Sequence, residues 1–181
     1  LGGKVGSLII GDLHNAQIDV SGAGDLTIRA GRVSDSQLHA PLANLTLVAS
    51  NWLSSTAGAS QFELAALRSL TTSGDFNADL KVSGQGVTTY ALGSVQIGGT
   101  ISGGVWSIEG RGSSLQAGST SNAWRANLSG TLVQFITRGD ASGSLSLAAL
   151  QLMQVGGSAR NFTLLVGADL GDDSALGGNG L

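Results

Sequence analysis

The sequence has no cysteine, a single proline and methionine, and only two histidines, His14 and His39, in 181 residues. The absence of cysteine excludes disulfide scaffolds, thiol chemistry and cysteine-ligated zinc. Charged residues are 12% of the chain, about half the usual share. The nine lysines and arginines are scattered, so no nucleic-acid partner is expected. No apolar run reaches the roughly 18 residues of a membrane helix, and no transmembrane segment is predicted.

Small residues dominate what is present. The chain has 29 glycines, 24 serines and 12 threonines, and 41% of its residues are hydrophobic. The hydrophobic share argues against global disorder. The glycine content argues against a helical fold, because each interior glycine costs about 1 kcal/mol. The exception is the segment 61–68, which has helix-forming residues and is expected to form a short helix.

Apolar residues that follow short polar corners recur about every twenty residues. In the register that aligns best, they are Leu8, Leu26, Leu45, Leu70, Val95, Leu115, Phe135 and Val155. A second inward position follows two residues later in most repeats, as strands with one buried face require. A glycine then follows in five of the repeats, at Gly11, Gly74, Gly99, Gly118 and Gly139.

Short strands, glycine corners and this period predict an all-β fold, a parallel β-solenoid of about eight coils. The general rule for parallel crossovers makes it right-handed. We expect residues 1–181 to form one solenoid domain, either as a processed chain or as a segment of a longer repeat protein. The two longest repeats should bulge at Ser54–Ser60 and near Gln85–Thr89. The alternative is an antiparallel sandwich, which lacks hairpin signals here.

Candidate catalytic residues are sparse. Asp75 and Asp140 occupy equivalent places three coils apart, roughly 14 Å at the usual strand spacing, too far for a glycosidase pair. His14 and His39 fall at different places in their coils, which disfavours a serine triad. The tripeptide Arg138-Gly139-Asp140 lies on a glycine corner, where coincidence explains it. We therefore expect no enzymatic activity and no catalytic residue.

Calcium is the best cofactor candidate. Asp169, Asp172 and Asp173 cluster on a glycine-rich stretch, and calcium favours such oxygen ligands. The segment 21–28 also matches half of a calcium-binding nonapeptide repeat. The alternative interpretation of the three aspartates is an acidic loop without metal.

Three segments carry a resemblance to known repeats: Leu70–Leu80, Gly104–Gly110 and Phe135–Leu145. They resemble repeats of very large surface proteins of planctomycete-type bacteria. More loosely, the chain is similar to filamentous-haemagglutinin-like β-solenoids. The resemblance covers most of residues 70–170. It implies an extracellular or cell-surface location and a structural, adhesive or stalk role, and it transfers no catalytic residue.

The expected function is therefore structural: a segment of a surface fibre, filament, surface layer or adhesin stalk. Its expected partners are other copies or neighbouring repeats, end to end. One alternative is a module that binds or cleaves surface glycans, in which Trp52, Trp106 and Trp124 would stack on sugars. A second alternative is a calcium-dependent adhesion module.

Overall fold

The computed structural model describes residues 6–86 and 89–167. This part of the chain contains strands and no helix. The strands are β1 (Ser7–Ile10), β2 (Leu13–His14), β3 (Gln17–Asp19), β4 (Gly24–Ser34), β5 (Gln37–Leu53), β6 (Gln61–Thr72), β7 (Phe76–Asn77), β8 (Asp79–Val82), β9 (Leu92–Ile108), β10 (Gly112–Thr120), β11 (Trp124–Thr137), β12 (Ala141–Val155) and β13 (Ala159–Val166).

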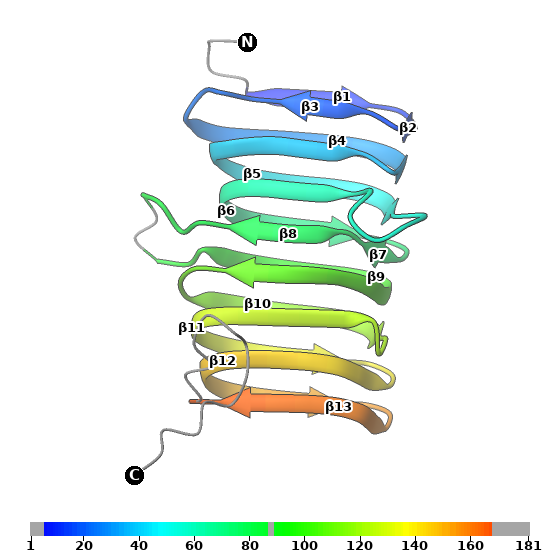
Figure 1. The fold of residues 1–181 in the computed structure, drawn as a ribbon, viewed down its shortest axis with the longest axis vertical. Coiled ribbons are helices and arrows are strands. Elements are labelled where there is room, and N and C mark those ends of the chain that lie inside the picture. The colour runs from blue at the N-terminus through cyan, green and yellow to red at the C-terminus, as the bar shows by residue number, and fades with distance from the viewer. Residues whose placement is uncertain (1–5, 87–88, 168–181) are drawn as a thin grey trace.

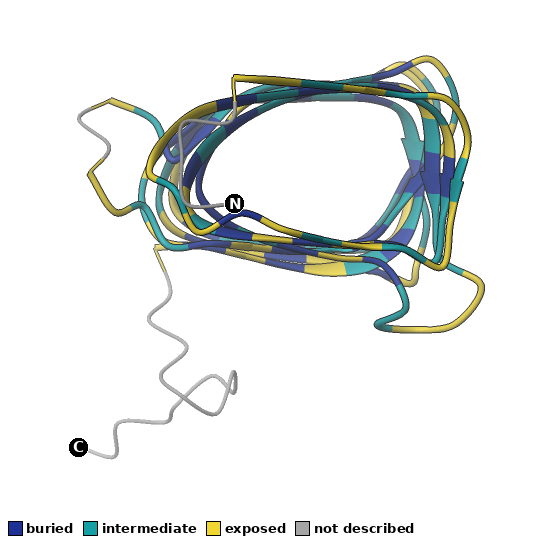
Figure 2. Ribbon diagram, turned by 90° about the horizontal axis from the view of Figure 1, so that it is seen from above, coloured by how far each residue is buried: buried dark blue, intermediate teal, exposed yellow. Residues whose placement is uncertain are grey.

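The strands form one sheet that winds on itself, with the order β1-β4-β5-β6-β8-β9-β10-β11-β12-β13 along its main path. Every pairing is parallel. The predicted β-solenoid is thus confirmed, and the antiparallel sandwich is wrong. Figure 1 shows the coils stacked along one axis, and Figure 2 shows a flattened oval cross-section with two long faces. We call the face that contains β1 and β10 the first face, and the face that contains β3, β8 and β13 the second face.

Strand pairing defines the true repeat register. One inward column of the first face runs through eight coils: Leu8, Ile28, Leu47, Leu70, Val95, Leu115, Phe135 and Met153. The predicted register is correct from Leu70 to Phe135. It is two residues out at Leu26, Leu45 and Val155, which belong to neighbouring inward columns. The cause is that the inward columns on either side are also largely apolar, so a shift of two residues preserves the inward pattern.

The segment 61–68 is strand, not helix, which corrects the expectation of a short helix. It lies in β6, whose backbone pairs with β5 on one side and β8 on the other. Phe62 aligns with Leu38 and Leu80, and all three side chains are buried. Pairing on both sides and burial of Phe62 outweigh a helix propensity of a few tenths of a kcal/mol per residue.

Both predicted bulges are found between strands. The first occupies 54–60, between β5 and β6, and the second falls between β8 and β9, where the structure describes residues 83–86 and 89–91. Both project from the ends of the oval in Figure 2. The extra residues leave the coil at corners, so the strands on either side keep their pairing.

The core is a set of columns of aligned side chains that runs along the solenoid axis. Its largest members form a chain of aromatic contacts with ring centroids 4.4 to 5.9 Å apart. The chain comprises Trp52, Phe62, Phe76, Trp106, Trp124, Phe135 and Phe162. These contacts cross several coils, so they tie together layers that are distant in sequence.

Glycine serves two different purposes at the corners. Gly84 has φ +68°, a conformation that other residues rarely adopt. By contrast Gly99, Gly118 and Gly139 do not have positive φ. At Gly118 and Gly139 an added Cβ would approach the backbone of the preceding coil, so close approach is the reason for glycine there.

The aromatic chain allows a test with two matched residues. Trp106 and Trp124 are both fully buried, but the Trp106 indole N–H donates to the Ala78 carbonyl at 3.1 Å, whereas the Trp124 indole has no hydrogen-bond partner among the described residues. Both Trp→Phe changes reduce packing. Only Trp106→Phe also strands a buried carbonyl, which costs roughly 1–3 kcal/mol.

We therefore expect Trp106→Phe to lower the free energy of unfolding by at least about 1 kcal/mol more than Trp124→Phe does. Urea denaturation of the two variants measures the difference. Equal losses would show that the hydrogen bond to Ala78 contributes nothing.

Candidate functional site

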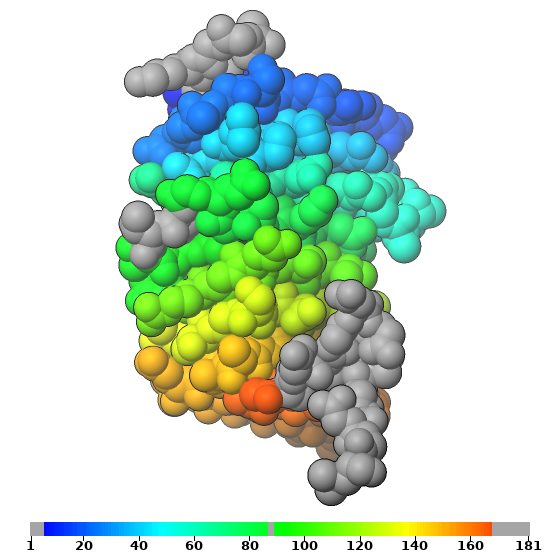
Figure 3. Space-filling view, turned by 60° about the vertical axis from the view of Figure 1, so that its left-hand side comes forward, coloured from blue at the N-terminus to red at the C-terminus, as the bar shows by residue number. Residues whose placement is uncertain are grey.

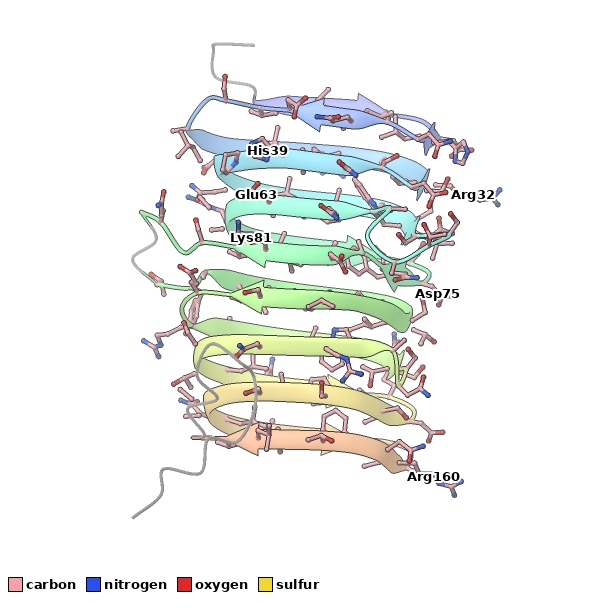
Figure 4. All side chains as sticks on the ribbon, viewed as in Figure 1. Arg32, His39, Glu63, Asp75, Lys81 and Arg160 are labelled. Carbon is pink, nitrogen blue, oxygen red and sulfur yellow. The ribbon has the colours of Figure 1, made fainter. Side chains whose placement is uncertain are left out.

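A polar site lies in a shallow depression of about 400 Å³ on the second face. Its floor is formed by β5, β6, β8 and β9, and its charged side chains come from successive coils. His39, Glu63 and Lys81 lie one beside the next across β5, β6 and β8 (Figure 4). Gln37, Gln61 and Asp79 form a second row beside them. We call His39, Glu63 and Lys81 the charged ladder.

The ladder centres on Glu63. Its carboxylate lies 2.7 Å from His39 Nδ1 and 3.0 Å from Lys81 Nζ. The Lys81 ammonium is the main cause that lowers the pKa of Glu63, and His39 contributes less. The ladder is solvent-exposed, since the Lys81 side chain keeps 68% of its accessible surface.

This geometry suits a structural link between coils better than general acid catalysis. A general acid needs a carboxyl whose pKa is raised by an apolar environment, and Glu63 has the opposite shift. The Lys81 ammonium and the His39 imidazole both contact the same carboxylate. The ladder therefore links three coils through their side chains, in addition to the backbone bonds.

A second recurring arrangement lies at the corner after the first-face strands. Asp12 Oδ1 accepts a hydrogen bond from Arg32 N at 2.8 Å, Asp75 Oδ1 from Thr100 N at 2.7 Å, and Asp140 Oδ1 from Ser158 N at 2.8 Å. Each carboxylate thereby satisfies a backbone donor of the next coil. Directly before each donor stands a glycine, at Gly31, Gly99 and Gly157, whose missing side chain leaves room for the carboxylate.

The predicted equivalence of Asp75 and Asp140 is thus confirmed, but the sequence analysis did not foresee the hydrogen bond that each carboxylate accepts. A signal existed: each aspartate follows a glycine, and another glycine stands one coil later. Asp35 has a related role, because its carboxylate accepts from Ser55 N at 2.7 Å, and this bond is the main cause that lowers the pKa of Asp35.

The two histidines lie on the surface. His14 Nδ1 lies 2.6 Å from Ser34 Oγ, and Asn15 Nδ2 lies 3.0 Å from His14 Nε2. If the Asn15 amide donates to Nε2, the ring proton is on Nδ1 and is donated to Ser34. The serine is then an acceptor, and the imidazole does not serve it as a base.

The three tryptophans are buried: Trp106 and Trp124 have no exposed surface and Trp52 has 1%. The hypothesis of sugar stacking relied on these residues, and none of them reaches the surface. The tripeptide Arg138-Gly139-Asp140 is also engaged within the fold. Arg138 Nη2 donates to the Gly98 carbonyl at 3.0 Å, and Asp140 binds Ser158 N.

The calcium candidates Asp169, Asp172 and Asp173 lie outside the described residues. In the nonapeptide-like segment, Asp25 is bound by Asn44 Nδ2 and by Arg68 Nη2, each at 3.0 Å. Over residues 6–86 and 89–167, no group of three or more histidines, aspartates or glutamates converges in a way that could hold a metal ion.

Comparison with protein-family models, with curated proteins and with solved structures finds no match to this chain. Within the part of the chain that the structure describes, no helix is long and apolar enough to span a membrane.

The ladder predicts a pH-dependent contribution to stability. Because the pKa of Glu63 is lowered in the folded state, its interactions stabilise the fold at pH values above the ordinary carboxyl pKa of about 4.5. This stabilisation is lost as the pH falls through the folded-state pKa. We expect Glu63→Gln to lower the free energy of unfolding by about 0.2–1 kcal/mol at pH 7 and low salt. The difference from the unmodified chain should vanish below the folded pKa and shrink at 1 M salt. Denaturant melts from pH 7 to pH 3 measure this, and a pH-independent difference would contradict it.

The aspartate–glycine corner predicts a coupling between two sites. A methyl group on Gly31 would lie 2.5 Å from Asp12 Oδ1, so Gly31→Ala should cost about 1–2 kcal/mol. Asp12→Ala removes the bond to Arg32 N and should cost about 1 kcal/mol. The double variant should lose less than the sum, because the closest contact of the methyl is then gone and only the Gly11 carbonyl, at 3.1 Å, remains tight.

Urea denaturation of the four proteins in this cycle measures the coupling. Gly11→Ala is the matched control, since a methyl there meets nothing within 4 Å and should change stability little. Strict additivity of the two changes would show that the carboxylate does not restrict position 31.

Proposed function

We propose that this chain is a structural segment of an extracellular fibre, surface layer or adhesin stalk, and that it associates through the ends of its solenoid. The observation that carries the proposal is the contrast between equivalent inward positions. Leu145 and Leu147 in β12 are 0% and 2% exposed, whereas Leu164 and Val166, their register partners in β13, are 37% and 48% exposed. The same columns that are closed inside the rod are open at its last described coil.

The backbone supports the same proposal. Gly167 N donates to the Leu147 carbonyl at 2.9 Å. Donors alternate between the two sides of a parallel strand, so the N–H groups of Leu164 and Val166 face away from β12. An edge strand with free donors and apolar side chains is a template for another strand.

The first described coil has the matching character. Leu8 and Ile18 are partly buried members of the core, whereas the residues below them in register, Ile28 and Leu38, are each 1% exposed. Both ends of the described solenoid therefore offer apolar positions that one further coil would cover.

The lateral surface supports a mechanical role over a catalytic one. Figure 3 shows the coils as successive bands along one flank of the rod. The charged ladder and the corner aspartates described above all connect one coil to the next. Stability in such an array sums over neighbouring coils, which suits a load-bearing element. The cell-surface location follows from the resemblance of the repeats.

The proposal is tested by one change at the open end and one on the flank. Leu164→Glu places a charge on the open end of the core. Val105 in β9 is also exposed, at 58%, but it lies on the flank in the middle of the rod, where it pairs with Arg125 of β11. We expect Leu164→Glu to weaken self-association at least tenfold and Val105→Glu to leave it unchanged.

Light scattering over a concentration series and negative-stain electron microscopy measure the association, with thermal melts to confirm that both variants fold. An unmodified chain that stays monomeric at high concentration would contradict the proposal. So would equal effects of the two changes.

A further inference from the structure

The two ends of the described solenoid differ at one position of a single core column. This column lies next to the one that contains Leu70 and runs Leu26, Leu45, Leu67, Leu92, Gly112, Leu132 and Leu150. In the first coil its place is taken by Gly6, since Ser7 pairs with Thr27 and Thr27 N donates to the Gly6 carbonyl at 3.1 Å. The column thus has a glycine at one end and a leucine at the other.

The missing side chain at Gly6 leaves a hollow. A space of about 390 Å³ is lined by Gly6, Leu26, Val20 and the corner that follows β3. A Cβ built on Gly6 meets nothing within 4 Å. The hollow therefore has room for an apolar side chain from outside the coil, and the Leu26 and Val20 side chains at its base are themselves 1% and 4% exposed.

The chain itself shows how such a gap is filled. Gly112 occupies the same column between Leu92 and Leu132. A Cβ there would lie 2.7 Å from Leu132 Cδ1 and 3.6 Å from Leu92 Cδ2. The neighbouring leucines thus fill the space that the glycine leaves, and the order leucine, glycine, leucine is a packed arrangement in this core.

At the opposite end, Leu150 is the last described member of the column, and it is only partly buried. Placed one strand spacing from Gly6 of a second copy, Leu150 would face Leu26 across that glycine, as Leu92 faces Leu132 across Gly112. The adjacent columns agree in character. Met153 would align with Leu8, and Leu164 with Ile18, each pair belonging to one column within the chain.

The spacing between the two core columns differs between the two ends of the solenoid, and the same difference occurs within the chain. The two columns are two residues apart at Gly6 and Leu8, but three apart at Leu150 and Met153. The same change occurs between β5 and β6, where the register shifts between Leu45 and Thr46. A joint between copies therefore needs no irregularity that the fold does not already contain.

We propose that copies of this chain stack head to tail in one register, with Leu150 of one copy entering the hollow at Gly6 of the next. This inference rests on the proposed function, because it specifies the contact through which the solenoid ends associate. It excludes symmetric pairing of two like ends, since two Gly6 hollows or two Leu150 side chains do not complement each other.

Disulfide trapping tests the register, because the chain has no cysteine of its own. In one molecule, positions 6 and 150 lie seven coil steps apart, about 34 Å at 4.8 Å per step, far beyond the Cα separation of less than about 7 Å that a disulfide allows. Oxidation of the double variant Gly6→Cys/Leu150→Cys should therefore yield a ladder of linked multimers on a non-reducing gel. The ladder should collapse on reduction.

Three control variants distinguish other geometries. Gly6→Cys/Leu152→Cys moves one thiol to an outward position and should give at least tenfold less linked material. Gly6→Cys alone would form dimers only if two N-terminal ends meet, and Leu150→Cys alone only if two C-terminal ends meet. Efficient dimerisation of either single variant, or equal ladders from both double variants, would overturn the head-to-tail register.

Light scattering of the reduced proteins separates failure of this inference from failure of the proposed function. Assembly without a link between positions 6 and 150 overturns the register alone, whereas absence of assembly overturns both. In a second test, Gly6→Leu fills the hollow within the same copy. This change should raise the concentration needed for assembly at least tenfold without lowering the melting temperature, and unchanged assembly would contradict the insertion of Leu150.

Discussion

Parallel, in-register pairing of each coil with the next is the interaction on which the rest of this structure depends. Its repeat of about 4.8 Å places residues some twenty positions apart directly above one another. One result is the column from Leu8 to Met153, in which every member is apolar. The same spacing brings aromatic rings of successive layers into contact. The core is therefore a consequence of backbone register rather than of a single packed centre.

The same constraint explains where the chain varies. A strand cannot gain residues without disturbing both neighbours, so the extra length of two repeats leaves the coil at corners, at 54–60 and between β8 and β9. Corners also hold the polar interactions that strands cannot supply. The carboxylates of Asp12, Asp75 and Asp140 each bond to a backbone N–H of the next coil. Because the following coil passes so close, glycine is required beneath each carboxylate.

Because each coil is covered by its neighbours, inward side chains are buried in the interior of the rod and partly exposed at its ends. Inside the rod, a coil is covered on both sides, and Leu145 has no exposed surface. In the last described coil its partner Leu164 is covered on one side only. The proposed association of copies thus uses the interaction that already holds the coils together. Gly6 and Leu150 give this association a direction, because a hollow at one end and a side chain at the other favour head-to-tail stacking.

The sequence by itself determined the all-β fold class and the repeat of about twenty residues, because alternating apolar residues and glycine corners recur along the chain. It also identified the register from Leu70 to Phe135, where the extra residues of the one longer repeat lie in the loop between β8 and β9 and leave the strand pattern intact. Only the tertiary structure decided the register of the outer coils, since an error of two residues leaves an apolar pattern unchanged. It likewise decided that 61–68 is strand, because pairing on both sides outweighs local propensity. The charged ladder is decided by the tertiary structure alone, since its members lie about one coil apart and meet only when the strands align. The aspartate–glycine corners leave a Gly-Asp pattern in the sequence, but the backbone N–H that each carboxylate binds is known only once the register is known.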